Sequence, residues 1–93
     1  MASVYISEYA DVRGNAAYEP STALQKLTSA ATSSQSAAFD ANTNWVRVHT
    51  DGVVSIKFGT NPTATTGSLR LAAGQTEYFC IVPGHKVAII DNT

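Results

Sequence analysis

The stretch from Trp45 to Gly59, WVRVHTDGVVSIKFG, constrains the fold of this chain more than any other. Apolar and polar residues alternate along it on both sides of Asp51-Gly52. A period of two is typical of β-strands that have one buried face and one solvated face. We therefore predict two antiparallel strands here, joined by a short turn into a hairpin.

The register of this predicted hairpin follows from the rule that directly opposite residues of an antiparallel pair lie on the same face. A turn of only Asp51-Gly52 would place apolar residues opposite polar ones, whereas a loop of Thr50-Asp51-Gly52 keeps both faces consistent. The second choice gives two apolar pairs, Val48 with Val54 and Val46 with Ile56. It also puts Gly52 where a left-handed residue and a bulge are expected.

Further short strands, separated by turn residues, are predicted along the rest of the chain. In the second half the turns recur about every eight to twelve residues, a spacing typical of all-β sandwiches. We predict an all-β fold, a small antiparallel β-sandwich or jelly-roll-like domain of about eight short strands. The predicted strands begin at Val4, Gln25, Ser36, Trp45, Val53, Ser68, Thr76 and Lys86.

The N-terminal third leaves alternatives open within the single domain that we expect over residues 1–93. VYISEY, from Val4 to Tyr9, is β-branched and aromatic and predicts a strand, and an irregular connection follows over residues 11–20. Residues 1–20 either cross over their own domain or reach out as an arm to a neighbour's sheet edge. Residues 21–36 lack a helical apolar stripe, so we prefer strands at Gln25–Thr32 and Ser36–Phe39.

Two predicted strands near the C-terminus, over residues 76–82 and 86–91, are apolar on both faces. A thin sandwich covers only one face of a strand, so the second cover is either a long loop or another subunit. Between these strands, Pro83-Gly84 has the composition of a type II turn. Cys80, the only cysteine, is predicted to be a buried, inert thiol.

The charge pattern argues against several classes of partner. Charged residues make up 14% of the chain and the formal net charge is −1, so no basic field exists to collect phosphates, and we do not expect nucleic acid binding. No apolar run is long enough to span a bilayer and no signal peptide is recognisable, so we expect no membrane partner and no secretion. A single cysteine precludes an internal disulfide and fits a reducing compartment.

Motifs for catalysis or cofactor binding are not found in the sequence. Most of the seven acidic residues fall in turns or at strand ends, and the two histidines have no metal-ligand spacing. No serine lies in a GxSxG context and no glycine-rich loop leads from a strand into a helix. We predict a protein that is not an enzyme, with no catalytic residues, no metal site and no cofactor.

Candidate interface residues are large aromatic and apolar side chains together with the tip of the long polar loop at 59–67. Trp45 has the parity of the polar residues of its strand, so we expect it on the outer face, where Lys57 of the paired strand would make a cation–π contact. A less favoured reading uses Trp45 and the loop to stack a sugar. The candidates are Tyr5, Tyr9, Trp45, Asn61, Pro62, Tyr78, Phe79 and Ile81.

The order of motifs SSQSAAF, VRVHTDGVVSIKFGTNPTAT and LAAGQTEYFCIVPGHKVAII resembles small structural proteins of tailed bacteriophages. The resemblance covers about Ser33 to Thr93. It implies a virion component, a capsid decoration or cement protein assembled in the host cytoplasm. Such a protein would form a homo-oligomer and bind the major capsid protein or other phage structural proteins. We expect strands 76–82 and 86–91 to form subunit contacts, and the loop 59–67 and the N-terminal strand to touch the shell. The alternative is a carbohydrate- or receptor-binding module of a phage tail or fibre.

Overall fold

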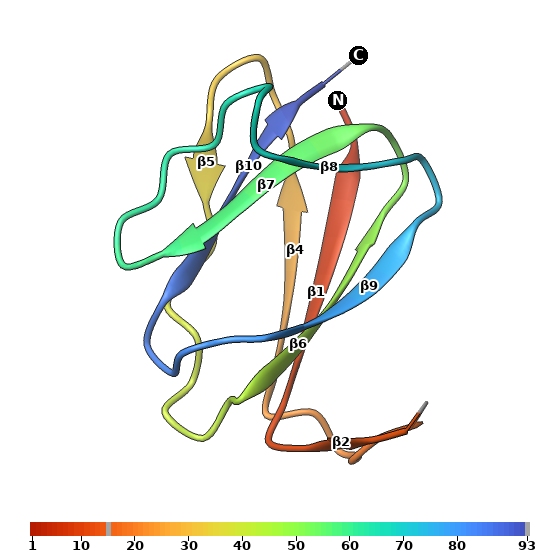
Figure 1. The fold of residues 1–93 in the computed structure, drawn as a ribbon, viewed down its shortest axis with the longest axis vertical. Coiled ribbons are helices and arrows are strands. Elements are labelled where there is room, and N and C mark those ends of the chain that lie inside the picture. Colours follow the sequence, from red (N-terminus) through yellow and green to blue (C-terminus); the bar gives the residue numbers. More distant parts are fainter. Residues whose placement is uncertain (15, 93) are drawn as a thin grey trace.

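The computed structural model describes residues 1–14 and 16–92, and all regular structure in them is β-strand. Two four-stranded antiparallel sheets face each other, and a short two-stranded hairpin lies at one end (Figure 1). This arrangement confirms the predicted all-β antiparallel sandwich. The strands are β1 (Ser3–Tyr9), β2 (Val12–Arg13), β3 (Ala16–Ala17), β4 (Ala23–Thr28), β5 (Ser34–Gln35), β6 (Trp45–Thr50), β7 (Val54–Gly59), β8 (Leu69–Leu71), β9 (Thr76–Cys80) and β10 (Lys86–Asp91).

The strand order is β4-β1-β6-β9 in one sheet, called the first sheet, and β5-β10-β7-β8 in the other, the second sheet. The N-terminal strand β1 pairs with both β4 and β6 of its own chain, so in this structure it crosses its own domain and does not reach out as an arm. Part of the connection predicted to be irregular forms the small β2-β3 hairpin.

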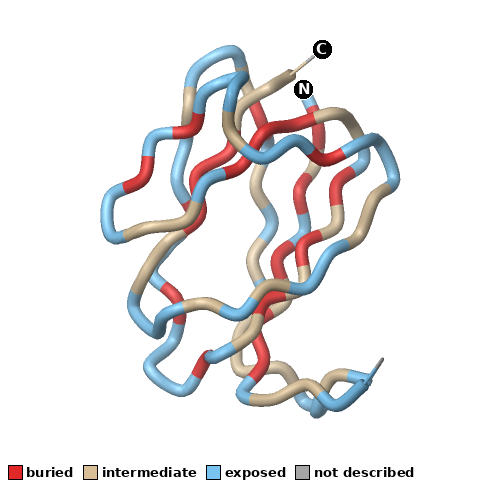
Figure 2. Tube along the Cα trace, viewed as in Figure 1, coloured by how far each residue is buried: buried red, intermediate tan, exposed pale blue. Residues whose placement is uncertain are grey.

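The core lies between the sheets and is built from alternate residues of their central strands (Figure 2). Val46 and Val48 of β6 are fully buried, and so are Val54 and Ile56 of β7. The prediction of which residues turn inward along this stretch is therefore confirmed. Other buried apolar side chains of the core are Ala2, Val4, Ile6, Phe39, Leu71, Val87 and Ile89.

The predicted hairpin between β6 and β7 is wrong, because the two strands belong to different sheets. β6 pairs with β1 and β9, while β7 pairs with β10 and β8. Their dry faces meet across the core instead of lying side by side in one sheet. Alternation is the same in both arrangements, so it does not distinguish strands paired within a sheet from strands packed across a sandwich. From β4 onward, only the connection between β7 and β8 stays within one sheet.

Gly52 is needed for a different reason from the one predicted. The glycines with positive φ among the described residues are Gly14, Gly74 and Gly84, so Gly52 is not the left-handed residue of a bulge. A Cβ added at Gly52 would lie 3.0 Å from the Cβ of Ala2, which is itself buried. A glycine here therefore allows the chain to pass close to the N-terminal strand as it crosses between sheets.

The long loop over residues 59–67 covers the outer face of the second sheet. Gln35 of β5 donates from Nε2 to Asn61 Oδ1 at 2.8 Å and to the Pro62 carbonyl at 2.7 Å. The Ala64 amide donates to Ser33 Oγ at 2.9 Å, and Ala64 is only 2% exposed. Beneath the loop lies the outer face of β10, where Ala88 is 0% exposed. The loop is thus placed to cover this part of β10, and the subunit contact predicted for the strand stays a prediction.

Several boundaries and turns also test the sequence predictions. β10 has the predicted bounds, and the type II turn is confirmed because the His85 amide donates to the Val82 carbonyl at 3.1 Å with Gly84 at φ 84°. The strands in the Ser- and Thr-rich region begin earlier than predicted, at Ala23 and Ser34. Where the alternation of apolar and polar side chains is weak, pairing with neighbouring strands determines where a strand begins.

Cys80 is exposed, which contradicts the prediction of a buried thiol. It lies directly opposite Trp45 on the outer side of the edge strand β9. Its neighbours Phe79 and Ile81, on the other side of the strand, take the positions that pack against the core. An apolar strand at a sheet edge buries one of its faces here, and Cys80 is on the face left to solvent.

Candidate functional site: the outer face of the first sheet

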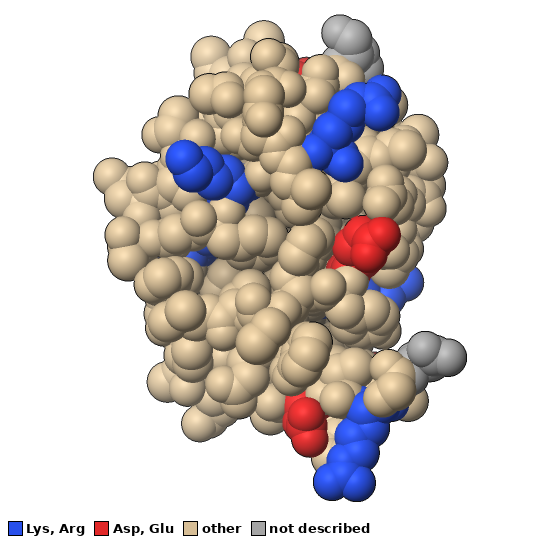
Figure 3. Space-filling view, viewed as in Figure 1, with Lys and Arg blue, Asp and Glu red and all other residues tan. Residues whose placement is uncertain are grey.

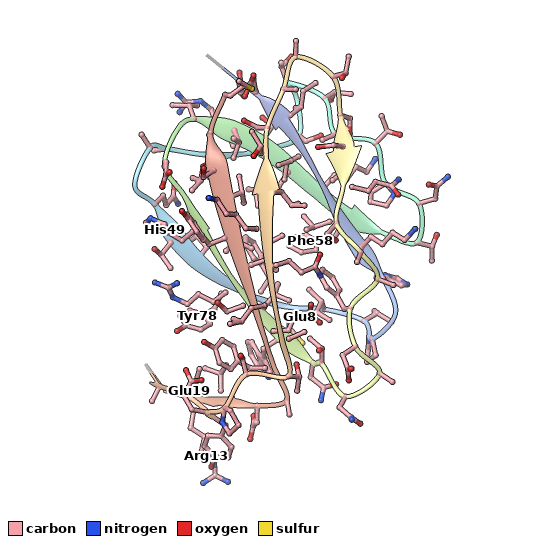
Figure 4. All side chains as sticks on the ribbon, turned by 180° about the vertical axis from the view of Figure 1, so that it is seen from behind. Glu8, Arg13, Glu19, His49, Phe58 and Tyr78 are labelled. Carbon is pink, nitrogen blue, oxygen red and sulfur yellow. The ribbon has the colours of Figure 1, made fainter. Side chains whose placement is uncertain are left out.

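The outer face of the first sheet is a continuous surface built from four strands. Side chains that alternate with the core residues line up across it in rows, because the register sets them directly opposite one another. Lys26, Tyr5, His49 and Thr76 form one row, and Leu24, Ser7, Arg47 and Tyr78 form the next. Figure 4 shows His49 and Tyr78 pointing away from the interior on the same side of the molecule.

Aromatic and apolar groups dominate the exposed area of this face. Leu24 is 72% exposed, Tyr5 40% and Tyr78 38%. A hollow of about 250 Å³ lies between β1 and β4, lined in part by Tyr5, Leu24 and Lys26. Large apolar side chains left in water are unfavourable unless something else covers them, so this face has the composition of a contact surface.

The row through Tyr5 is held in place by its own contacts. The Lys26 ammonium lies 5.5 Å from the centroid of the Tyr5 ring, a cation–π arrangement. On its other side the Tyr5 ring lies 6.3 Å from the His49 ring, and His49 Nδ1 is 2.7 Å from Thr76 Oγ1. Contacts of this kind restrict side-chain rotamers, and such restriction before binding reduces the conformational entropy lost on binding.

At one end of this face the exposed Glu19 carboxylate accepts from the hydroxyl of Tyr9, and the rest of the face carries positive charge. Its outward positions carry Lys26 and Arg47, and no Asp or Glu occupies an outward position on β4, β1, β6 or β9. In the view of Figure 3, side chains of both signs are visible and scattered over the surface. Away from the end that carries Glu19, the outer face of the first sheet is therefore basic and aromatic, although the chain as a whole is slightly acidic.

Four of the predicted interface residues come together in this sheet, namely Tyr5, Tyr9, Trp45 and Tyr78. Tyr9 pairs directly with Trp45, which is half-buried and faces outward as predicted. Tyr9 itself is only 6% exposed, so it is not available to a partner. Its hydroxyl donates to Glu19 Oε2 at 3.2 Å, and burial together with that contact raises the pKa of Tyr9.

The other predicted interface residues lie elsewhere. Phe79 and Ile81 point toward the core and are half-buried, and the Phe79 ring lies 5.0 Å from that of Phe58. Asn61 is exposed but Pro62 is buried, and both belong to the loop over the second sheet. Because the loop and Trp45 lie on the outer faces of different sheets, they do not form the single sugar platform that the sequence suggested.

The predicted cation–π contact between Trp45 and Lys57 is also wrong. It depended on pairing β6 with β7, and the residues directly opposite Trp45 are Tyr9 and Cys80. Cation–π contacts occur instead between Lys26 and Tyr5 and between Arg13 and Tyr18, the latter at 5.6 Å. Tyr18 of the N-terminal connection thus packs against Arg13 of its own hairpin.

Glu8 is a buried acid that sequence reasoning grouped with solvated ones. It is 1% exposed, and Figure 4 places it between the sheets. Asp40 donates its backbone amide to Glu8 Oε1, and Thr43 donates its hydroxyl to the same oxygen, both at 2.9 Å. Gln25 Nε2 donates to Glu8 Oε2 at 2.9 Å. The parity of Glu8 with Val4 and Ile6 along β1 was the signal for burial in the sequence.

The Glu8 carboxylate stabilises the fold through its hydrogen bonds. Each oxygen is bound by donors from the segments that close one end of the sandwich, and no buried side-chain nitrogen or oxygen among the described residues lacks a partner. In the described part of the chain, no cluster of three or more His, Cys, Asp and Glu side chains is arranged to hold a metal ion. Over residues 1–14 and 16–92 there is also no helix long and apolar enough to cross a membrane.

Comparison with known proteins adds no further constraint on function. No protein-family model matches the chain, and no curated protein or solved structure matches it at a significant level.

Proposed function

We propose that this protein is a non-enzymatic structural protein of a tailed bacteriophage, a capsid decoration or cement protein that binds neighbouring protein chains through the outer face of its first sheet. The observation that carries the proposal is the set of aromatic and apolar side chains exposed on that face, where Leu24, Tyr5 and Tyr78 are all open to solvent. The resemblance of residues 33–93 to small phage structural proteins supports the virion role.

The residue types on this face suit a protein partner. Tyrosine and arginine are enriched in the energetically important parts of protein interfaces, because they combine large contact area with hydrogen-bonding groups. Tyr5 and Tyr78 supply the first property, and Arg47 lies directly opposite Tyr78 in the adjacent strand. A stable interface of standard size buries about 800 Å² on each partner. A four-strand face offers area of that order.

The charge of the face specifies the partner further. With Lys26 and Arg47 outward and no acid on the outward positions of these strands, a surface that carries Asp or Glu among apolar groups would be complementary. The capsid protein to which this chain binds should therefore present such an acidic and apolar patch. Two copies of this chain joined face to face would instead bring like charges together.

Charge reversal on the two sheets tests the proposal. Arg47→Glu alters the proposed face, and Arg70→Glu makes the same change on the exposed outer side of β8 in the second sheet. We expect Arg47→Glu and Leu24→Glu to abolish incorporation into particles and to lower their heat stability, while Arg70→Glu behaves as wild type. Equal heat resistance of particles with and without the protein, or incorporation of Arg47→Glu at the wild-type level, would refute the proposal.

A second candidate function, a carbohydrate- or receptor-binding module of a tail or fibre, draws on the same face. Its support is the hollow beside Tyr5, since an aromatic ring next to a shallow cavity suits a sugar ring. A glycan array distinguishes the two candidates. Binding of a glycan that is lost in Tyr5→Ala but kept in Arg70→Glu would favour the second one.

A further inference from the structure

The outer strand β9 of the first sheet has a free backbone edge. The Ile81 amide donates to the Asn44 carbonyl at 2.9 Å, and the Thr50 amide donates to the Gln75 carbonyl at 3.2 Å. These two bonds fix which residues of β9 turn their backbone groups toward β6. In an antiparallel pair only every second residue bonds the neighbouring strand, and on β9 these are the odd-numbered residues. Thr76, Tyr78 and Cys80 therefore direct their N–H and C=O groups away from the sheet.

The other outer strands of the two sheets carry features that discourage pairing with another chain. β4 has Lys26 in its centre, β5 is 2 residues long, and β8 is 3 residues long with Arg70 in the middle. Short edges and charged side chains, Lys above all, are the usual means by which proteins protect free strand edges. β9 has 5 residues without Lys, Arg or Pro, and its one charge, Glu77, opposes pairing with acidic segments but not with basic ones. Figure 1 shows it at the outer side of its sheet.

Side chains along β9 define what could pair with it. Phe79 and Ile81 face inward but remain half-buried, so they keep apolar area at the rim of the core. Glu77 has the same inward parity, yet it is exposed and is bound only by Gln75 Nε2, at 3.0 Å. A strand added at this edge would place its own side chains about 5 Å from these three residues.

We propose that β9 accepts an extended segment of a partner protein as a fifth strand of the first sheet. The segment has a basic residue opposite Glu77 and apolar residues opposite Phe79 and Ile81, which gives alternate positions of basic, apolar and apolar character. The basic residue pairs with the Glu77 carboxylate, and the apolar residues cover the exposed parts of Phe79 and Ile81. This site uses the backbone edge of β9, whereas the proposed virion role uses outward side chains, so Tyr78 contributes its backbone to the first and its side chain to the second.

Charge favours a different protein over a second copy of this chain as the occupant. Two β9 strands paired antiparallel about Glu77 would set the two Glu77 carboxylates directly opposite each other. Pairing about Tyr78 would set each Glu77 against the apolar Phe79 of the other copy. A partner with Lys or Arg at this position avoids both arrangements.

A synthetic peptide tests the inference directly. The probe is a capped peptide with Lys, Val and Ile at alternate positions separated by Thr, and the control peptide has Glu in place of Lys. Amide hydrogen exchange followed by NMR reports each backbone N–H. We expect the Lys peptide, but not the Glu peptide, to slow exchange of the Thr76, Tyr78 and Cys80 amides by about tenfold or more at saturation.

Matched variants separate edge pairing from other modes of binding. Tyr78→Pro removes an outward N–H without removing a bond to β6, and an edge strand tolerates proline at such a position. Arg70→Pro makes the corresponding change on the outward edge of β8. Binding should be lost in Tyr78→Pro and kept in Arg70→Pro, and Glu77→Lys should reverse the preference between the two peptides.

Three results would overturn the inference. One is that the Lys peptide leaves the three amides unprotected. Another is that Tyr78→Pro binds the peptide as well as wild type does. The third is that the same amides become protected with rising protein concentration and no peptide, which would make a second copy the occupant. None of these results bears on particle incorporation, so the virion proposal stands or fails separately.

Discussion

Exchanging the carboxylate of Glu8 and the amide of Gln25 tests whether the hydrogen bonds of these two side chains stabilise their end of the sandwich. In Glu8→Gln, the introduced amide oxygen can still accept from the Asp40 amide and the Thr43 hydroxyl. Its NH₂ group, however, meets Gln25 Nε2, which now donates to Glu8 at 2.9 Å. Gln25 is not free to turn over, because it bonds the amide and the carbonyl of Ala37 at 2.9 Å and 3.3 Å.

The expected magnitude follows from these contacts. Glu8→Gln loses one hydrogen bond to a buried carboxylate and leaves two donors facing each other, which costs about 2–3 kcal/mol. Gln25→Glu alone places two carboxylates in contact and should cost about as much. In the double variant, the amide at position 8 donates to the carboxylate at position 25, which still accepts from the Ala37 amide. We expect a favourable coupling energy of about 3 kcal/mol or more.

Urea unfolding followed by Trp45 fluorescence and far-UV circular dichroism measures these effects. With a slope of about 1 kcal/mol per molar urea for a chain of this size, each single variant should lower the midpoint by about 2 M. The double variant should recover most of that loss. Additive losses in the double variant, or a single variant within about 0.5 kcal/mol of wild type, would show that Glu8 is not held by these bonds.

Two further changes test the close packing near the N-terminus and the buried tyrosine. Gly52→Ala should destabilise the protein by about 1–3 kcal/mol because the new Cβ lies 3.0 Å from that of Ala2, whereas Gly67→Ala, with 3.8 Å to its nearest contact, should be nearly neutral in thermal unfolding. Because the pKa of Tyr9 is raised in the folded protein, its stabilising contribution is complete below the unfolded value of about 10 and is lost as the pH rises through the folded value. Unfolding free energies measured from pH 8 to pH 12 should therefore decline less steeply in Tyr9→Phe than in wild type. The control variant Tyr18→Phe, at an exposed position, should retain the wild-type slope. Equal slopes in all three proteins would show that Tyr9 does not contribute to the pH dependence of stability.

Local chemistry in the sequence was sufficient to predict the strand class and the inward-facing residues. Alternation along residues 45–59 identified Val46, Val48, Val54 and Ile56 as buried, and all four are at most 1% exposed. Pro83-Gly84 predicted a turn because its backbone preferences are intrinsic to those two residues. Such features depend on a few adjacent residues, so they can be predicted without knowing which strands lie next to them.

The candidate site was only partly predictable. Parity placed Trp45 on an outward face, but it could not place β1 between β4 and β6, and that order is what brings Tyr5 beside His49. The exposure of Leu24 likewise depends on the register of β4 against β1, which the Ser- and Thr-rich sequence hardly specifies. Strand order arises from contacts between residues far apart in the chain, and no short-range pattern records it.

The sequence by itself determined which side of β6 and β7 is dry, that a type II turn falls at Pro83-Gly84 and that the chain is all-β. The tertiary structure decided that β6 and β7 pack across the core in opposite sheets, that the loop 59–67 covers β10, and that Glu8 is buried among donors. The physical reason is that burial of a face requires only some apolar partner. Which partner supplies it is settled by the free energy of the whole fold, in which every strand must find hydrogen bonds and every dry face a cover.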